Sequence, residues 1–139
     1  KVTQLIPVKS MKAPVKSRFF NYFLIQYHDL IMVRKRTERD IWNELYDFPL
    51  VESVGLLDQK EILQSEMVKC FFDDKVFVVE EIAGPFSQQL THQKIVAKVI
   101  SIRAKRKTVP LPGAEWVPKA GLDDLPFPKI LHPFSKGRF

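Results

Sequence analysis

Residues 18–36, with the sequence RFFNYFLIQYHDLIMVRKR, decide the fold class of this chain. Aromatic and aliphatic residues dominate positions 18–27, the turn-forming pair His28-Asp29 follows, and a second apolar run at 30–36 ends in basic residues. This pattern predicts a β-hairpin. Because the first strand is largely apolar on both of its faces, we expect both faces to be covered by other parts of the protein.

Residues 58–72 predict a helix from the signals at its start. Asp58 stands at the N-cap and Glu61 follows three residues later, which is the spacing of a capping box. Leu57 and Ile62 stand where a hydrophobic staple would close the first turn. The apolar stripe that follows is expected to pack on the sheet.

Several apolar runs around this helix predict further strands. One run is expected to end at Gly84-Pro85, because this dipeptide breaks regular structure, and residues 86–92 are expected to form a polar loop. The expected strands lie near Leu50 and at 75–82, 93–104 and 114–117, and a Pro-punctuated helix is expected from Leu122 to Phe134. This order predicts an α+β fold in which helices flank a mixed β-sheet.

The chain of 139 residues has the length of one domain. We expect residues 1–17, which are polar and contain two prolines, to form an extended connector, and residues 18–139 to form the folded domain. Cys70 is the single cysteine, so an internal disulfide is excluded and a zinc motif is not expected. No apolar run reaches the length of a membrane span, and we expect a protein of the cell interior.

The net charge of +6 is unevenly distributed along the chain. Residues 1–39 contain nine Lys and Arg against two acidic residues, residues 40–81 contain three Lys against eleven acidic residues, and residues 82–107 contain six basic residues and no acidic one. If the two basic segments converge in the fold, they create a positive face for a polyanion such as nucleic acid. A solvated surface of uneven charge is the alternative.

The order of hairpin, loop and helix prompts a comparison with the Nudix box, which clusters carboxylates at one end of a helix to hold Mg²⁺ against a pyrophosphate. Counted from Gly55, the spacing places Glu61 correctly, but Lys69-Cys70 stands where Arg-Glu is required and Asp73-Asp74 where Glu-Glu is required. The box is therefore degenerate, and Glu61 already belongs to the predicted capping box. We expect no metal site and no catalytic residue in this chain.

Three segments, in this order, resemble the C-terminal domain of the MutY family of adenine DNA glycosylases: RKRTERDIWNELYDFPLVE (34–52), QQLTHQKI (88–95) and EWVPKAGLDDLPFPKIL (115–131). The resemblance implies a Nudix-like fold related to the MutT pyrophosphohydrolases, and a role in base excision repair. The full enzyme of that family is a hydrolase, an N-glycosylase, that removes adenine paired with 8-oxoguanine. Its C-terminal domain recognises the oxidised guanine on the other strand.

The resemblance also implies what accompanies this chain. Adenine excision and a [4Fe-4S] cluster belong to a separate N-terminal catalytic domain of the same protein, and Cys70 alone cannot hold such a cluster. No cofactor is expected in this chain itself. Its implied partners are that catalytic domain and double-stranded DNA containing 8-oxoguanine opposite adenine. We expect a monomer without membrane contact in the bacterial cytoplasm, associated with the nucleoid.

A family pattern of aromatic-Ser/Thr-His, which reaches the 8-oxoguanine, corresponds to Leu90, Thr91 and His92 here, with Gln89 beside them. Oxidation at C8 converts N7 of guanine from a hydrogen-bond acceptor into an N–H donor, and the Thr91 hydroxyl can accept from it. His92 is expected to orient the loop or contact the DNA backbone, and Leu90 departs from the family's aromatic residue. Without the resemblance, an ordinary turn with a solvent-facing histidine is the simpler explanation.

Basic residues near this loop are candidates for DNA-backbone contacts, which fix the register of a protein on DNA without reading its sequence. The candidate set is Lys94, Lys98, Arg103, Arg36 and Arg18. Two other functions stay open on the sequence. One is a Nudix-type nucleotide pyrophosphohydrolase with a degenerate box, and the other is a protein-interaction module that docks partners through the connector.

Overall fold

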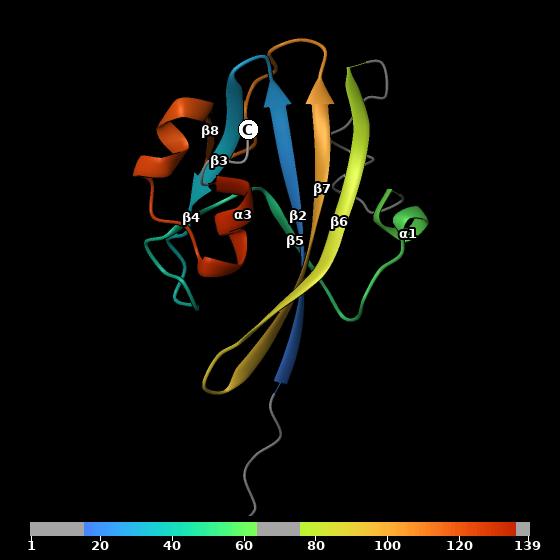
Figure 1. Ribbon diagram of the computed structural model, residues 1–139, viewed down its shortest axis with the longest axis vertical. Coiled ribbons are helices and arrows are strands. Elements are labelled where there is room, and N and C mark those ends of the chain that lie inside the picture. The colour runs from blue at the N-terminus through green and yellow to red at the C-terminus, as the bar shows by residue number, and fades with distance from the viewer. Residues whose placement is uncertain (1–15, 64–75, 136–139) are drawn as a thin grey trace, which may run out of the picture.

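The computed structural model describes residues 16–63 and 76–135. Within these two ranges, a seven-stranded mixed sheet forms the body of the molecule (Figure 1). The main path of the sheet runs β4-β3-β2-β7-β6, with β5 paired to β2 and β8 paired to β3. Its strands are β2 (Lys16–Tyr27), β3 (Leu30–Lys35), β4 (Tyr46–Asp47), β5 (Leu50–Ser53), β6 (Phe77–Gln89), β7 (Gln93–Ala104) and β8 (Ala114–Pro118). The predicted α+β class is confirmed.

The predicted hairpin of β2 and β3 is confirmed, and its strands pair next to the turn. Farther from the turn, β2 pairs in parallel with β7, from Lys16 opposite Gln93 to Gln26 opposite Arg103. β2 is therefore a central strand, which explains its apolar character on both faces. The strand begins at Lys16, two residues before the expected start of the domain.

Two hydrophobic cores lie on opposite faces of the sheet, because successive side chains of a strand point to opposite sides. The odd-numbered residues at 95–99 of β7 belong to one buried cluster, which we call the C-terminal core because it includes Phe134. The even-numbered residues at 100–104 belong to the second cluster, the α1 core, together with Ile62 of α1 (Gln59–Leu63).

The strand β6 does not end where the sequence predicted. Gly84-Pro85 was expected to end this strand, with a loop at 86–92. Instead, β6 continues to Gln89, and the dipeptide lies at a shift in the β6–β7 register between residues 83 and 86. Gly84 has φ +106°, and a Cβ at this position would lie 2.8 Å from the carbonyl oxygen of Ala97. Glycine therefore lets β6 pass close to β7 without breaking the pairing.

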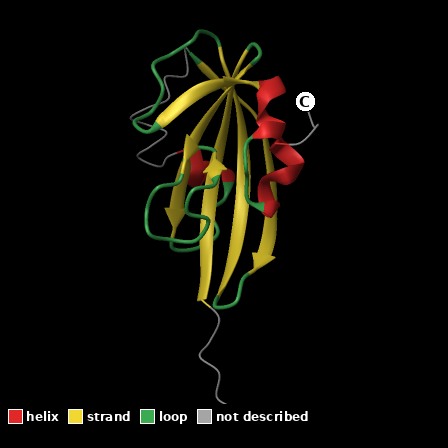
Figure 2. Ribbon diagram, turned by 90° about the vertical axis from the view of Figure 1, so that its left-hand side faces the viewer, coloured by secondary structure: helices red, strands yellow, loops and turns green. Residues whose placement is uncertain are grey.

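The terminal segment is not the single helix that the sequence predicted from Leu122 to Phe134. It forms two 3-10 helices, η1 (Lys119–Asp124) and η2 (Lys129–Leu131), and the short helix α3 (His132–Ser135). Pro126 and Pro128 separate η1 from η2, and Pro133 lies at the second position of α3, where its missing N–H group prevents the helix from running continuously through this segment. The pieces lie along one side of the sheet, where they contribute to the C-terminal core (Figure 2).

The start of α1 confirms the predicted capping box. The Asp58 N–H donates to Glu61 Oε1 (3.1 Å), and the Glu61 N–H donates to Asp58 Oδ1 (2.8 Å). Ile62 is buried and Leu57 packs against the same core, as a staple requires. The rest of the helix predicted up to residue 72 lies outside the described residues. In the described part of the chain, no helix is both long enough and apolar enough to cross a membrane.

The C-terminal core contains the buried side chain of Tyr22, which carries a polar hydroxyl group. The Tyr22 hydroxyl forms no hydrogen bond within the described residues, and burial raises the pKa of this phenol. A buried polar group without a hydrogen bond destabilises the folded state. We expect Tyr22→Phe to raise the free energy of unfolding by about 1 kcal/mol, as measured by urea denaturation. A lower free energy of unfolding in the variant would show that the hydroxyl is bonded in solution.

Candidate nucleic-acid interface

The turn between β6 and β7 presents the predicted reading residues at one end of the sheet (Figure 1). The turn closes through a hydrogen bond from the Leu90 N–H to the Gln93 carbonyl oxygen (2.7 Å). The side-chain amide of Gln89 donates to the carbonyl oxygens of Leu90 (2.8 Å) and Gln93 (3.3 Å), which braces the turn. Thr91 and His92 are exposed, and their side chains form no hydrogen bond with any described residue.

The turn rests on a packed base. Leu90 is half-buried against the C-terminal core. Behind it, the ring of Phe86 packs edge-on against the ring of Phe134, with 5.6 Å between their centroids. The Ile130 N–H donates to Gln88 Oε1 (3.1 Å), which ties the hairpin to η2. Leu90 therefore anchors the turn to the core.

Arg18 lies beside this turn at the centre of an ion-pair cluster. Its guanidinium binds the carboxylate of Asp40 (2.8 and 2.9 Å) and that of Glu52 (2.8 and 2.7 Å), and it donates to Gln93 Oε1 (3.1 Å). Hydrogen bonds to Glu52 and Asp40 raise the pKa of Arg18, and Arg18 in turn lowers the pKa of both carboxyl groups. Because its donors are engaged, Arg18 supports the turn and offers little to a phosphate.

This cluster makes stability depend on pH. A carboxyl group whose pKa is lowered in the folded state stabilises the fold above its unfolded pKa, and that contribution is lost as the pH falls through the folded pKa. For Asp40 and Glu52 we therefore expect the urea midpoint to fall between about pH 5 and pH 2. The decline should be shallower in Arg18→Met, because Arg18 is the main cause of both lowered pKa values and only Arg36 then remains beside Asp40. Parallel curves for the two proteins would contradict this account.

Two of the predicted DNA-backbone residues are engaged inside the protein. Arg36 is 3% exposed and donates to Asp47 Oδ2 (3.1 Å), which belongs to a fully buried side chain. Lys98 is half-buried and donates to the carbonyl oxygen of Leu57, which holds the segment before α1 against β7. Both residues stabilise the fold, and Arg36 has no surface on which a phosphate could bind.

The exposed candidates Lys94 and Arg103 lie near opposite ends of β7. They are nine positions apart, which corresponds to about 30 Å along an extended strand. Arg103 also pairs with Glu80 (3.0 Å) at the surface. The basic segment 82–107 is therefore divided between the two ends of the sheet, and it does not form one positive face. Lys94 is the candidate that is both exposed and adjacent to the turn.

Glu61, the first carboxylate of the degenerate box, is exposed on α1, but its Oε1 already accepts the Asp58 N–H. The later box positions, 69–74, lie outside the described residues. Within 16–63 and 76–135, no group of three or more His, Cys, Asp or Glu side chains is arranged to hold a metal ion. The one box carboxylate that can be placed therefore has a structural role.

A comparison with protein families decides the relationship of the chain. The model described as NUDIX domain matches residues 21–136, which is most of the sequence. The chain belongs to the NUDIX domain family. The eroded spacing from Gly55 onward is consistent with this membership, because the box is recognisable while most of its required residues are replaced. A comparison with proteins of curated function finds no match.

Solved structures similar to this NUDIX domain share its fold at low sequence identity. The MutT protein from Methanosarcina mazei Go1 is 16% identical, with a TM-score of 0.61, over 90% of this chain and 94% of that one. The C-terminal domain of mouse MUTYH, solved in complex with human PCNA, is 13% identical, with a TM-score of 0.60, over 81% of each chain. The E. coli ORF135 protein is 13% identical, with a TM-score of 0.57, over 95% and 92%. A MutT protein and a MUTYH domain share this fold, so the fold alone does not indicate which of their activities, if either, this chain has.

Several residues that support the turn of this NUDIX domain were not predicted from the sequence. The position of the turn followed from local sequence, but the cluster around Arg18 did not, because its partners Asp40 and Glu52 lie 22 and 34 positions away. Gln88 and Gln93, which tie the turn to η2 and to Arg18, also gave no local signal. Such pairings depend on how β2, β5 and β7 come together.

Proposed function

We propose that this NUDIX domain is a DNA lesion-recognition module that reads 8-oxoguanine opposite adenine, as the C-terminal domain of an adenine glycosylase. The supporting observation is the turn between β6 and β7, in which exposed Thr91 and His92 stand on a base braced by Gln89 and Leu90. A contact that distinguishes two bases needs groups held in place before DNA arrives. The resemblance of residues 88–95 to the family's reading loop supports the same function.

In this proposal, Thr91 and the turn backbone share the recognition of the lesion. The Thr91 hydroxyl accepts a hydrogen bond from the N7–H of 8-oxoguanine. Because a hydroxyl can also donate to the bare N7 of guanine, discrimination needs a second contact. A backbone N–H of the turn supplies it by donating to the C8 carbonyl oxygen, which guanine lacks. Lys94, exposed beside the turn, would contact a phosphate and set the register.

Replacing Thr91 with valine keeps the shape of the side chain and removes its hydroxyl. We expect Thr91→Val to weaken binding to a duplex with 8-oxoguanine opposite adenine by about fivefold to tenfold. Binding to the duplex with guanine opposite adenine should weaken less, because guanine lacks the C8 oxygen through which the turn backbone holds N7 next to the hydroxyl, so the preference for the lesion falls. Fluorescence anisotropy with two duplexes that differ in this one base measures the preference. Thr91→Ser should keep it, and Ser87→Ala, exposed in the same hairpin, is the matched control. Equal binding of both duplexes by the unmodified chain would contradict the proposed recognition of 8-oxoguanine.

The proposal assigns catalysis to another part of the assembly. Adenine excision would be carried out by an N-terminal catalytic domain that holds a [4Fe-4S] cluster, and this chain would act as its monomeric reading half inside the cell. Addition of a separately produced catalytic domain should therefore strengthen binding to the lesion duplex. A catalytic domain that gains neither affinity nor selectivity from this chain would contradict the division of labour.

A nucleotide pyrophosphohydrolase is the second candidate, because the chain belongs to the NUDIX family and Glu61 is exposed at the first box position. The decisive assay is phosphate or pyrophosphate release from 8-oxo-dGTP with Mg²⁺. We expect none, since the Glu61 carboxylate is held by Asp58 and the paired carboxylates of the box are shortened or replaced. Release that disappears in Glu61→Gln would favour hydrolysis over lesion recognition.

A further inference from the structure

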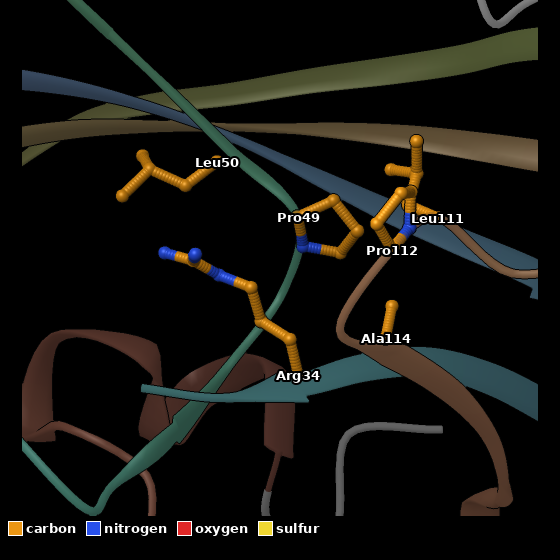
Figure 3. Close-up of a pocket in the computed structure, with 6 residues that line it drawn as sticks. All are labelled: Arg34, Pro49, Leu50, Leu111, Pro112 and Ala114. Carbon is orange, nitrogen blue, oxygen red and sulfur yellow. The ribbon is translucent and has the colours of Figure 1, made fainter. Parts of the chain in front are cut away.

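A pocket separate from the β6–β7 turn opens where β3, β5 and the segment before β8 meet (Figure 3). Pro49 faces Leu111 and Pro112 across it, Ala114 lies at its base, and Arg34 and Leu50 lie toward one end. Arg34 and Ala114 are opposite each other in the β3–β8 pairing. The wall is therefore apolar except for a single guanidinium.

The size of the pocket suits one large apolar side chain. Its volume is about 170 Å³, and a cavity of roughly 150 Å³ lined by apolar side chains is known to accommodate benzene. Two of the lining residues, Pro49 and Pro112, have a fixed φ, so the pocket is formed in advance of binding. A leucine or phenylalanine side chain fits these properties.

The guanidinium of Arg34 adds a charge at the rim. Its Nε and Nη2 donate to Asp47 (2.7 and 3.2 Å), which fixes the plane of the group. Its Nη1 has a weaker partner, Glu38 at 4.0 Å, whose side chain is 61% exposed. An incoming carboxylate can therefore approach Nη1 while Asp47 keeps Arg34 in place.

The loop that supplies Leu111 and Pro112 extends this surface. Thr108 is fixed by a hydrogen bond from the Trp116 indole N–H to its carbonyl oxygen (2.8 Å), and the Ala114 N–H donates to the Leu111 carbonyl oxygen (2.9 Å). Between these anchors, Val109 is 84% exposed. The same loop begins with exposed Lys105, Arg106 and Lys107. The eight residues 105–112 thus include three basic side chains, an exposed apolar side chain and two residues that line the apolar pocket.

We propose that this pocket and its loop bind an acidic peptide segment of a partner protein, with one large apolar side chain of that segment in the pocket. Negative residues beside it would pair with Arg34 and with the basic residues at 105–107. The surface lies apart from the turn at 90–92, so its occupant would leave Thr91 accessible. The inference does not depend on lesion recognition.

Fluorescence anisotropy with a synthetic probe tests the proposal. The probe is a fluorescein-labelled peptide of eight residues with a Leu-Phe pair between acidic residues, and its partner peptide replaces that pair with Ser-Gly at the same charge. We expect the first peptide to bind at least about tenfold more tightly than the second. Ala114→Leu fills the pocket and should abolish this difference, while circular dichroism and urea denaturation establish that the variant is folded.

A charge-matched pair of variants tests the electrostatic part. The triple variant with glutamine at Lys105, Arg106 and Lys107 should weaken binding by about tenfold or more at low salt. A control triple variant with glutamine at Lys16, Lys60 and Lys129, which are exposed elsewhere, should bind nearly as tightly as the unmodified chain. Equal losses in the two triple variants, or equal binding of the Leu-Phe and Ser-Gly peptides, would overturn the proposal. Displacement of the peptide by 8-oxo-dGTP or by duplex DNA would also overturn it, because the site would then be a nucleotide or polyanion site.

Discussion

Replacing Asp47 with asparagine is expected to destabilise the fold by about 3–5 kcal/mol. The Asp47 carboxylate is fully buried and accepts from Arg34 (2.7 and 3.2 Å) and from Arg36 (3.1 Å). Burial raises the pKa of Asp47, and the two guanidinium groups oppose this shift. Removal of the carboxylate charge leaves Arg36, whose side chain is 4% exposed, as a buried cation with a long contact of 3.3 Å to Asp40.

Urea denaturation of Asp47→Asn and Asp40→Asn separates this buried interaction from a surface one. Asp40 is 30% exposed, so its loss should cost about 1 kcal/mol or less. A double variant, Asp47→Leu with Arg36→Met, should recover much of the stability, since an apolar pair leaves no buried charge behind. If Asp47→Asn is no less stable than Asp40→Asn, the buried cluster does not contribute as the distances indicate.

The second large effect is expected at Gly84. A Cβ at this position would lie 2.8 Å from the Ala97 carbonyl oxygen, and φ is +106°. Both the backbone conformation and the close approach oppose any side chain, so Gly84→Ala should lower the free energy of unfolding by about 2–4 kcal/mol. Because the outer half of the β6–β7 hairpin begins here, the variant should also lose affinity for the lesion duplex.

Two other glycines provide matched controls for Gly84→Ala. Gly113 has φ +80° but open space around its Cα, so Gly113→Ala tests the backbone conformation alone. Gly121 has neither feature, and Gly121→Ala should be neutral or slightly stabilising, by about 0.4–1 kcal/mol. Urea denaturation should rank the variants in the order 84, 113, 121. A loss at Gly113 equal to that at Gly84 would show that the contact with Ala97 is unimportant.

Local patterns predicted most of the fold. The hairpin at 18–36, the strand at 93–104 and the capping box of Asp58 and Glu61 all depend on neighbours in the sequence, and all are confirmed. Gly84-Pro85 misled the prediction of β6, because a bulge lets a strand continue through residues that usually end one. The single terminal helix predicted at 122–134 was wrong, because the prolines in this segment divide it into shorter helices.

The turn that carries the candidate residues could be expected from local sequence, whereas the contacts that hold this turn in place could not. Thr91 and His92 came from a short motif, and the structure places them exposed on a turn. The anchoring of Leu90 and the cluster of Arg18 depend on contacts between distant segments, for which one sequence gives no signal. Of the five basic candidates, Arg18 and Lys94 lie near the turn, whereas Arg103 lies about 30 Å farther along β7 and Arg36 and Lys98 are engaged inside the fold.

The parallel pairing of β2 with β7 also determines when this protein can fold. Residue 16 of β2 pairs with residue 93, and residue 26 with residue 103, so every rung joins positions 77 apart in the chain. Closing so long a loop is entropically slow, and proteins dominated by such contacts fold slowly. During synthesis on the ribosome, the apolar strand β2 cannot pair with β7 until residue 104 has emerged. Aggregation of the incomplete chain is therefore the hazard that this topology creates for the cell.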